Sequence, residues 1–203
     1  MIIGIPTERK TLECRVGLTP DGARALIADG HEVIVERSAG AGSFFDDLEY
    51  VKAGCRITAR LEQIWEEAEL IVKVKEPHEQ EYELFRPGQT IFSYLHLAGI
   101  PLAAEAMLRG GVTGIAYELV GDDNGALPLL EPMSRIAGRL AVAVGSHFLL
   151  TPQGGRGVLL SGSPGVPAGH VVIVGAGTAG KAACASAIGV GARVTVLDLS
   201  RPR

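Results

Sequence analysis

A chain of 203 residues is long enough for one large domain or two small ones, and either can bury a hydrophobic core. Hydrophobic residues make up 47% of the chain and charged residues 21%, a composition that excludes an intrinsically disordered protein. The formal net charge is −4 and no stretch concentrates Lys and Arg, which argues against nucleic-acid binding. The sequence therefore predicts a globular protein that does not bind nucleic acid.

The cysteines and the first residues indicate the compartment. Cys14, Cys55 and Cys184 are an odd number and lie far apart, which fits reduced thiols better than a disulfide framework. Residues Met1–Pro6 lack the basic and long apolar regions of a signal peptide. The longest nearly uncharged stretch, Leu140–Gln153, is too short to span a bilayer. We therefore expect a soluble, cytoplasmic protein without a membrane-spanning segment.

Short runs of β-forming residues alternate with helical patterns in the first part of the chain. One helix is predicted to begin at Pro20, because Thr19 is a suitable N-cap, and to end before Gly30. Further helices fit Leu61–Glu67 and Leu102–Arg109. Strands that alternate with helices predict an α/β fold with a parallel sheet. The predicted strands are Ile2–Ile5, Glu32–Glu36, Leu70–Val74, Thr90–Tyr94 and Thr113–Tyr117.

A long helix and a glycine-rich loop precede a second βαβ unit. The helix is predicted over Glu131–Leu150, where apolar residues recur every four positions, and Gln153–Gly169 is predicted as the loop. The unit itself has a strand at Val171–Val174, an Ala-rich helix to Gly191 and a strand at Arg193–Asp198. We therefore predict two domains, both Rossmann-like, joined by a helix. The boundaries are 1–130 for the substrate domain, 131–150 for the linking helix and 151–203 for an incomplete NAD-binding domain.

The turn before the Ala-rich helix has the sequence Gly175-Ala-Gly-Thr-Ala-Gly180. A G-x-G-x-x-G pattern alone also fits an ordinary glycine-rich turn, but this one follows an apolar strand, opens a helix and precedes a second strand ending in Asp198. Gly175 would make the tight turn, Gly177 would let the backbone approach a pyrophosphate, and Gly180 would let helix and strand lie close together. The spacing predicts a dinucleotide site with phosphates at the helix N-terminus.

Asp198 also indicates which dinucleotide binds. An acidic residue at this position accepts hydrogen bonds from the adenosine ribose and repels a 2′-phosphate, which favours NAD over NADP. Arg201 lies close in the sequence and leaves NADP open. The alternative for Asp198 is an ordinary surface carboxylate after a strand.

Three polar side chains in the first domain are candidates for chemistry. Lys75 and His96 follow two of the predicted strands, where open α/β sheets bind ligands. With Arg15, they supply cations for a keto-acid or amino-acid carboxylate and a proton donor or acceptor near pH 7. The same residues also suit a solvated lysine, a hydrogen-bonded loop histidine and a surface arginine, so spacing alone leaves both interpretations open.

A series of motifs, in order along the chain, resembles the bacterial alanine dehydrogenases. The resemblance extends over nearly every residue up to Asp198, and a set of spaced motifs is far more specific than one glycine fingerprint. The motifs are Gly4–Glu8, Arg15–Pro20, Gly30–Val33, Lys73–Pro77, Leu95–Ala98, Ala126–Leu130, Pro132–Ser134, Gly138–Ala141, Gln153–Val158 and Gly175–Gly180.

The resemblance implies an activity and a set of site residues. The activity is the NAD-dependent interconversion of L-alanine with pyruvate and ammonia. Arg15 and Lys75 would hold the substrate carboxylate and carbonyl, and His96 would be the acid–base group. Tyr94, Leu130 and Met133 would line the substrate pocket, although ordinary core packing explains these three equally well. The implied cofactor-binding residues are Ser134, Gly175, Gly177, Thr178, Ala179, Gly180 and Asp198.

Two related families provide contrasts. The NAD-binding domain of proton-translocating transhydrogenase shares the early and glycine-rich motifs, but the Lys75 and His96 pair favours the dehydrogenase. Saccharopine dehydrogenases of the lysine-forming type share the architecture and resemble this chain less. Two other functions stay open, a non-catalytic paralogue that binds nucleotide or a partner chain, and a transhydrogenase-like NAD(H)-binding subunit.

Alanine dehydrogenases continue well beyond residue 203, and the family places a catalytic aspartate and a substrate-side asparagine there. In a 3-2-1-4-5-6 sheet the strand at Val171–Val174 is central, so it would have an unpaired apolar edge. We therefore expect a homo-oligomer that associates through this region, or mobility of residues 151–203. We also expect weak NAD(H) binding and little or no turnover by the 203-residue chain.

Overall fold

The structure is a computed structural model that describes residues 1–200. Arg201, which the sequence placed in the choice between NAD and NADP, lies outside the described residues. The chain forms two compact units, Met1–Val120 and a second that begins at Gly121. Within residues 1–200, no helix combines the length and apolarity needed to cross a membrane.

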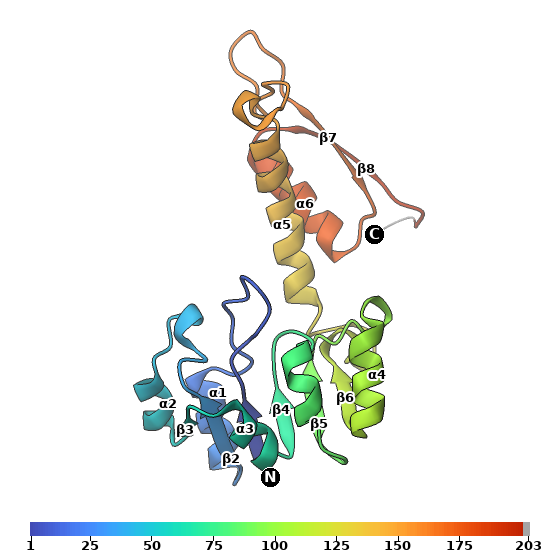
Figure 1. Ribbon diagram of the computed structural model, residues 1–203. Helices are drawn as coiled ribbons and strands as arrows, with labels where there is room; N and C mark the ends of the chain where they lie inside the picture. Colours follow the sequence, from blue (N-terminus) through green and yellow to red (C-terminus); the bar gives the residue numbers. More distant parts are fainter. Residues whose placement is uncertain (201–203) are drawn as a thin grey trace. The chain divides into compact units, whose positions relative to one another are not determined.

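The first unit contains a six-stranded parallel sheet with the strand order β3-β2-β1-β4-β5-β6 (Figure 1). This is the order of a doubly wound dinucleotide-binding fold, and it confirms the predicted α/β class with a parallel sheet. The strands are β1 (Ile2–Ile5), β2 (Glu32–Glu36), β3 (Arg56–Thr58), β4 (Leu70–Val72), β5 (Thr90–Ser93) and β6 (Thr113–Ala116).

Helices connect these strands. The predicted helix after Thr19 is α1, and Thr19 Oγ1 accepts a hydrogen bond from Gly22 N at 3.2 Å, as an N-cap does. The four α-helices are α1 (Pro20–Ala28), α2 (Asp47–Ala53), α3 (Leu61–Glu67) and α4 (Pro101–Gly110). Four short 3₁₀ turns are η1 (Ala41–Ser43), η2 (Glu79–Leu84), η3 (Leu97–Gly99) and η4 (Tyr117–Leu119).

The sequence interpretation missed α2 and β3 and made three strands too long. Helix α2 begins at a capping box between Asp46 and Glu49 and ends at Gly54, which has the left-handed conformation. These are helix start and stop signals, but the seven residues between them are too few and too mixed in polarity to show a helical period. Strand β4 stops at Val72 rather than Val74, because Val74 N donates to a Glu8 carboxylate oxygen instead of continuing the strand. Strands β5 and β6 likewise end one residue early.

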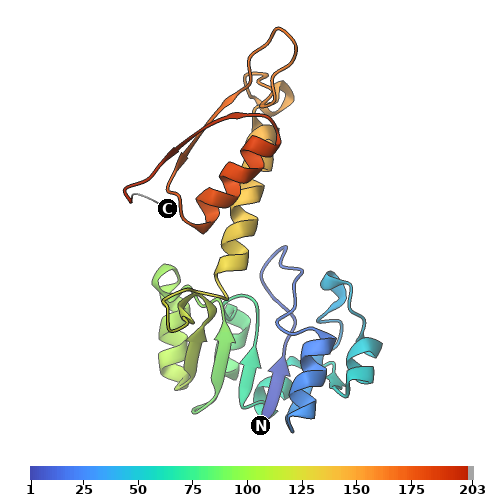
Figure 2. The ribbon, with the colours of Figure 1, turned by 180° about the vertical axis from the view of Figure 1, so that it is seen from behind.

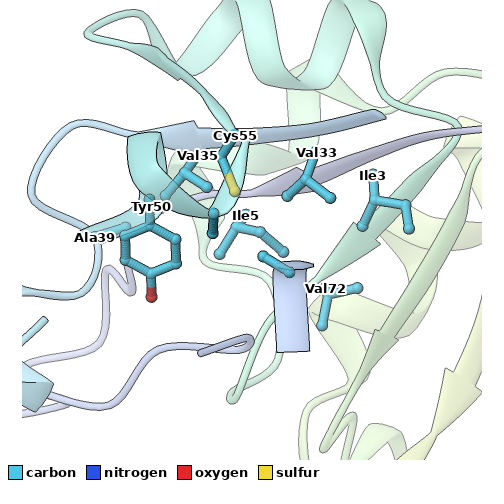
Figure 3. Packing of buried hydrophobic residues seen from close by; sticks show 10 residues of the cluster. Ile3, Ile5, Val33, Val35, Ala39, Tyr50, Cys55 and Val72 are labelled. Carbon is cyan, nitrogen blue, oxygen red and sulfur yellow. The ribbon is translucent and has the colours of Figure 1, made fainter. Parts of the chain in front are cut away.

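Apolar side chains form a core on each face of this sheet. Along β2, Val33 and Val35 belong to one cluster and Ile34 to the other, as the two-residue period of a strand requires. Figure 3 shows Val33 beside Ile3 and Val35 near the Cys55 side chain, all in the same cluster. Helices α1 and α2 cover this face, and α3 and α4 cover the other, so opposite views show helices on both sides (Figure 2).

The second unit contains the predicted long helix and βαβ unit. Strands β7 and β8 are parallel and pair along their whole length, from His170 with Arg193 to Val174 with Leu197. A Cβ on Gly138 would lie 2.1 Å from Ala179 O, so α5 and α6 lie in close contact. The elements are α5 (Glu131–Phe148), η5 (Thr151–Gln153), β7 (His170–Val174), α6 (Thr178–Gly189) and β8 (Arg193–Leu197).

The core of the second unit is small and lies between its helices and strands. It consists of Val142, Leu160, Ile173, Ala183 and Ala187, with half-buried neighbours around them. The helix α5 ends within two residues of its predicted C-terminus, and the segment 153–169 forms the expected loop apart from one isolated bridge. The compact units divide the chain at Val120/Gly121, and α5 belongs to the second unit. The predicted domain boundaries at 130/131 and 150/151 stay predictions.

Candidate functional site

The carboxyl ends of neighbouring parallel strands meet at one edge of the six-stranded sheet. The loop after β1 carries Glu8 and Arg15, the residues after β4 include Lys75, and those after β5 include Tyr94 and His96. The charges of Tyr94 and Glu8 both act on Arg15, which places the three within electrostatic reach of one another. The structure therefore brings four predicted site residues of the first unit, Arg15, Lys75, Tyr94 and His96, to the edge where α/β sheets bind ligands.

Buried charges hold the loop that carries Lys75. Glu8 Oε1 accepts a hydrogen bond from Val74 N at 2.6 Å, and Glu8 Oε2 accepts one from Lys75 N at 3.4 Å. The Lys73 ammonium lies 2.9 Å from Glu81 Oε1 and 3.7 Å from Glu8 Oε2, and all three side chains are almost fully buried. Burial raises the pKa of Glu8 even though Lys73 opposes the shift. Lys73 therefore serves the fold, while the half-buried Lys75 is the lysine that can reach a ligand.

Arg15 is oriented by its neighbour Glu13. Glu13 Oε1 accepts from Arg15 Nε at 2.8 Å, and Oε2 accepts from Arg15 Nη2 at 2.6 Å. These hydrogen bonds lower the pKa of Glu13 and raise that of Arg15. A Cβ on Gly17 would lie 2.7 Å from Val72 O, so the segment after Arg15 lies directly on the end of β4. The fork-shaped cation is thus fixed near the loop that carries Lys75.

His96 occupies a strained position at the end of β5. Its backbone is left-handed, with φ 46° and ψ 34°, and its side chain is 51% exposed. His96 N donates to Glu118 Oε1 at 2.7 Å, and the same oxygen lies 3.7 Å from His96 Nδ1. The Tyr94 ring stacks on the imidazole with centroids 6.3 Å apart and an angle of 14° between the planes. The imidazole is therefore ordered and still accessible.

Three aromatic rings pack together next to His96. The Tyr117 ring meets Tyr94 edge-on with centroids 5.0 Å apart and Phe92 edge-on with centroids 4.2 Å apart. Burial raises the pKa of both tyrosines, so their hydroxyls stay neutral at physiological pH. This part of the site supplies shape and neutral polar groups rather than charge.

The three glycines of the fingerprint differ in what the fold requires of them. Gly175 has φ +100°, and a Cβ on Gly180 would lie 1.8 Å from Gly175 O, so conformation and space demand glycine at these two positions. Gly177 has φ −67°, and a Cβ there meets no atom within 4 Å. Among residues 1–200, no atom lies close enough to require glycine at 177. A ligand that needs the backbone uncovered would explain it.

A cleft lies at the carboxyl ends of β7 and β8. Its volume is about 430 Å³, and it is lined by Val174, Gly175, Leu197, Asp198, Leu199 and Ser200. The Asp198 carboxylate accepts hydrogen bonds from Ala176 N at 2.5 Å and Ser200 N at 2.7 Å. Asp198 therefore joins the end of β8 to the glycine turn.

The remaining predicted residues lie at the starts of α5 and α6. Thr178 and Ala179 form the first turn of α6, and Ser134 lies one turn before Gly138, which contacts Ala179. Leu130 is the N-cap residue of α5 and, like Met133 and Ser134, is half-buried. The list Ser134, Gly175, Gly177, Thr178, Ala179, Gly180 and Asp198 thus falls entirely in the second unit, together with Leu130 and Met133.

Sequence reasoning did not single out four residues of the first-unit site, Glu8, Glu13, Tyr117 and Glu118. Glu8 and Glu118 follow β1 and β6, so the rule that strand ends gather ligand-binding groups contained a signal for both. Their contacts are made to backbone N–H groups of other strands, which no local spacing reveals. Among residues 1–200, no cluster of three or more His, Cys, Asp or Glu is suited to hold a metal ion.

A parallel doubly wound sheet followed by a βαβ unit with a glycine-rich turn defines a protein of the dinucleotide-binding α/β class. Two family models then identify the family: "Alanine dehydrogenase/PNT, N-terminal domain" matches residues 4–137, and "Alanine dehydrogenase/PNT, C-terminal domain" matches residues 141–203. The chain belongs to the alanine dehydrogenase/PNT family, which confirms the resemblance found in the sequence.

Individual relatives agree. The chain is 52% identical over 200 residues to alanine dehydrogenase of Mycolicibacterium smegmatis, covering 98% of this chain and 54% of that protein. It is 50% identical over 203 residues to alanine dehydrogenase of Bacillus subtilis, covering 100% of this chain and 53% of that protein. The chain therefore spans about half the length of the curated relatives that it matches.

Two solved structures show how far the fold is shared. An L-alanine dehydrogenase matches with a TM-score of 0.90 and 48% identity, covering 98% of this chain and 55% of that one. A transhydrogenase from Sinorhizobium meliloti matches with a TM-score of 0.79 and 30% identity, covering 99% of this chain and 57% of that one. The alanine dehydrogenase is the more similar of these two in both sequence and structure.

Proposed function

We propose that this chain supplies the substrate-binding and acid–base groups for NAD-dependent oxidative deamination of L-alanine to pyruvate and ammonia. The observation that carries the proposal is the gathering of Arg15, Lys75 and His96 at the carboxyl edge of one sheet. About 50% identity to proteins named alanine dehydrogenase, over the whole of this chain, supports the same activity.

Each of the three groups has a role that its chemistry suits. The Arg15 guanidinium, already oriented by Glu13, binds the substrate carboxylate through two parallel hydrogen bonds. The Lys75 ammonium binds the pyruvate carbonyl oxygen and stabilises negative charge that develops there. The His96 imidazole takes and returns the protons exchanged at the reacting carbon's nitrogen and oxygen substituents. By family resemblance, Tyr94, Leu130 and Met133 are further candidates for contacts with the substrate.

The chemistry that bound NAD would supply is acceptance of a hydride from the substrate carbon. The residues of the second unit fit such a cofactor, because Gly177 leaves backbone uncovered at the N-terminus of α6. Gly175, Thr178, Ala179 and Gly180 would hold the pyrophosphate of such a cofactor, and Ser134 would contribute its hydroxyl from the start of α5. Asp198 lines the neighbouring cleft, where its carboxylate binds the adenosine ribose and disfavours a 2′-phosphate.

The cofactor proposal is tested by comparing Gly177→Ala with Gly189→Ala. A Cβ meets no atom within 4 Å at either glycine, and both lie in or at the start of α6, so both variants should fold as the unmodified chain does. We expect Gly177→Ala to weaken NADH binding at least about tenfold, or about 1.4 kcal/mol, and Gly189→Ala to leave it unchanged. Titration by NADH fluorescence measures this. Equal affinity in the two variants would contradict the proposal.

The same titration tests whether the 203-residue chain binds NAD(H) only weakly, as the sequence predicts. L-Alanine-dependent formation of NADH measures turnover. In a preparation that turns over, we expect His96→Gln to lower kcat by about 10²- to 10⁴-fold, because the acid–base group is lost. An unchanged rate would remove His96 from this role.

A transhydrogenase-like NAD(H)-binding function is the second candidate, because a transhydrogenase structure matches 99% of this chain. It predicts NADH binding without any effect of L-alanine or pyruvate. Thermal unfolding in the presence of pyruvate separates the two candidates. If the chain acts on alanine, pyruvate should stabilise the unmodified chain against thermal unfolding and should not stabilise Lys75→Met. A non-catalytic paralogue would bind NADH tightly and show no turnover.

We also propose that the protein self-associates in the cytoplasm. The side chains of Val172, Val174 and Leu197 are 54%, 84% and 53% exposed, and β7 pairs within residues 1–200 only with β8. The three cysteines are free thiols, as in a reducing compartment. Light scattering should show a dimer or larger assembly, and Val174→Lys should weaken it. A strictly monomeric unmodified chain would contradict this proposal.

A further inference from the structure

His96 has a backbone conformation that L-residues seldom adopt. Its φ of 46° lies in the left-handed region, where a residue other than glycine is conformationally strained. Such a conformation persists only where neighbouring groups enforce it. The question is which contacts hold this residue at the end of β5.

Glu118 provides those contacts from a different strand. It lies in η4, directly after β6, and its side chain is 17% exposed. Its two carboxylate oxygens accept hydrogen bonds from consecutive backbone groups, Oε1 from His96 N at 2.7 Å and Oε2 from Leu95 N at 3.3 Å. One carboxylate thus accepts hydrogen bonds from the two consecutive N–H groups at this left-handed turn.

The same carboxylate also faces the imidazole. Glu118 Oε1 lies 3.7 Å from His96 Nδ1, which is ion-pair distance and slightly beyond a hydrogen bond. Catalytic hydrogen bonds are often long before a ligand binds. Tyr94 stacks on the ring face, so the ring has an acidic partner at one nitrogen and an aromatic support beside it. The contact with Glu118 is made by Nδ1, and Nε2 is the second ring nitrogen.

A neighbouring strand end shows the same arrangement around Lys75. Glu8 accepts from Val74 N and Lys75 N, just as Glu118 accepts from Leu95 N and His96 N. Glu8 is also paired with the buried Lys73, so its charge is already balanced within the fold. Among the contacts described here, the Glu118 carboxylate lies within ion-pair distance of the His96 ring alone.

We propose that Glu118 is a positioning residue for His96, which holds its strained backbone and keeps the imidazole proton on Nδ1. The inference rests on the proposed acid–base role of His96 and adds which nitrogen performs it. A proton held on Nδ1 by the carboxylate leaves Nε2 as the nitrogen that takes a proton from the substrate and returns it. Glu118 itself touches no reacting atom in this assignment.

The test is long-range ¹H–¹⁵N NMR of the histidine rings in the full 203-residue chain, at a pH where the rings are neutral. His96→Gln assigns the His96 signals among the five histidines. We expect the unmodified chain to carry the neutral ring proton on Nδ1, whereas free histidine prefers Nε2. In Glu118→Gln, one oxygen is replaced by an NH₂ group that cannot accept a hydrogen bond, and the Nδ1–H form should fall to a minority.

Glu105→Gln is the matched control, because Glu105 is exposed on α4 and neutralising it removes the same charge. It should leave the His96 ring signals unchanged. Unchanged His96 signals in folded Glu118→Gln would overturn the proposal. An unmodified chain with the proton on Nε2 would overturn it as well, even if Glu118→Gln failed to fold.

This outcome is separable from the fate of the proposed activity. The ring tautomer is measured without substrate, cofactor or turnover, so it reports the positioning alone. If His96→Gln leaves the rate of alanine oxidation unchanged, the activity proposal fails while the tautomer result stands. If the tautomer does not respond to Glu118→Gln, the positioning proposal fails while His96 remains a candidate acid–base group.

Discussion

The two units use the same building block, an apolar parallel strand followed by a helix, and bury it to different degrees. In the first unit, β1 has a neighbour on both sides, and Ile3 and Ile5 are 1% and 0% exposed. In the second, β7 pairs with β8, and Val172 and Val174 stay 54% and 84% exposed. The apolar strand with a neighbour on each side is therefore buried, whereas the strand that pairs with β8 alone within residues 1–200 stays partly exposed. We expect most of the folding free energy of residues 1–200 to come from the first unit.

The largest effect should come from the buried charges of the first unit. Glu81→Ala removes the carboxylate that lies 2.9 Å from the buried Lys73 ammonium, and leaves Glu8 at 3.7 Å as its remaining acidic neighbour. We expect the free energy of unfolding to fall by about 3–5 kcal/mol, because the buried ammonium loses its nearer carboxylate and its hydrogen bond. Urea titration followed by the fluorescence of the single Trp65 reports this unit. Glu79→Ala, in the same turn and exposed, should change it by less than about 0.5 kcal/mol.

The next effect tests the difference between the two units in apolar burial. Ile64→Ala empties a position that is 0% exposed, and should lower the unfolding free energy of the first unit by about 2–5 kcal/mol. Ile136→Ala removes the same atoms from α5, where the side chain is 49% exposed. Its effect on the Trp65 transition should be negligible. Equal effects of both variants on that transition would show that the units do not unfold independently.

A smaller effect is expected at the contact between α5 and α6. Gly138→Ala places a Cβ 2.1 Å from Ala179 O, and should destabilise the second unit by about 1–3 kcal/mol. Gly145→Ala lies on the same helix with no atom within 4 Å of the new Cβ, and should stabilise it by about 0.5–1 kcal/mol. Amide hydrogen exchange in α6 measures both changes. If the α6 amides are equally protected against exchange in both variants, the contact between Gly138 and Ala179 does not stabilise the unit.

The smallest predicted effect is a dependence on alkaline pH in the first unit. Burial raises the pKa of Cys55 from 9.0 to about 11, so the folded state keeps the thiol neutral where the unfolded state ionises it. The unfolded chain then binds fewer protons than the folded chain, and stability should fall as pH rises from about 9 to about 11. Urea titrations over this range should show the decline, and Cys55→Ala should reduce it. Burial also raises the pKa of Tyr50 from 10.0 to about 12, so this residue adds a further loss of stability between about pH 10 and pH 12.

Much of the fold was predictable because the signals are local. The strands at Ile2–Ile5 and Glu32–Glu36 and the helix capped by Thr19 follow from alternation of residue types and from capping chemistry. Helix α2 and strand β3 were missed because seven and three residues are too few to establish a period. Strand β4 was predicted too long because Lys73 and Val74 look like its continuation, although Glu8 takes the Val74 N–H.

The candidate site was predictable to a lesser extent. Lys75 and His96 stand out because they follow apolar strands, and Asp198 because it ends the second strand of the βαβ unit. Glu8 and Glu118 did not stand out, since their importance lies in contacts that span 66 and 22 residues of sequence. Spacing along the chain cannot reveal which backbone group a distant carboxylate accepts.

The sequence by itself determined the α/β class, the parallel sheet, the glycine fingerprint and the family. These properties depend on residue types at short range, where periodicity, capping and turn chemistry act. The tertiary structure decided that Lys73 is buried while Lys75 is not, and that Gly177, unlike Gly175 and Gly180, is not required by the fold. It also decided that Glu118 meets His96, because only the packing of parallel strands brings the ends of β5 and β6 side by side.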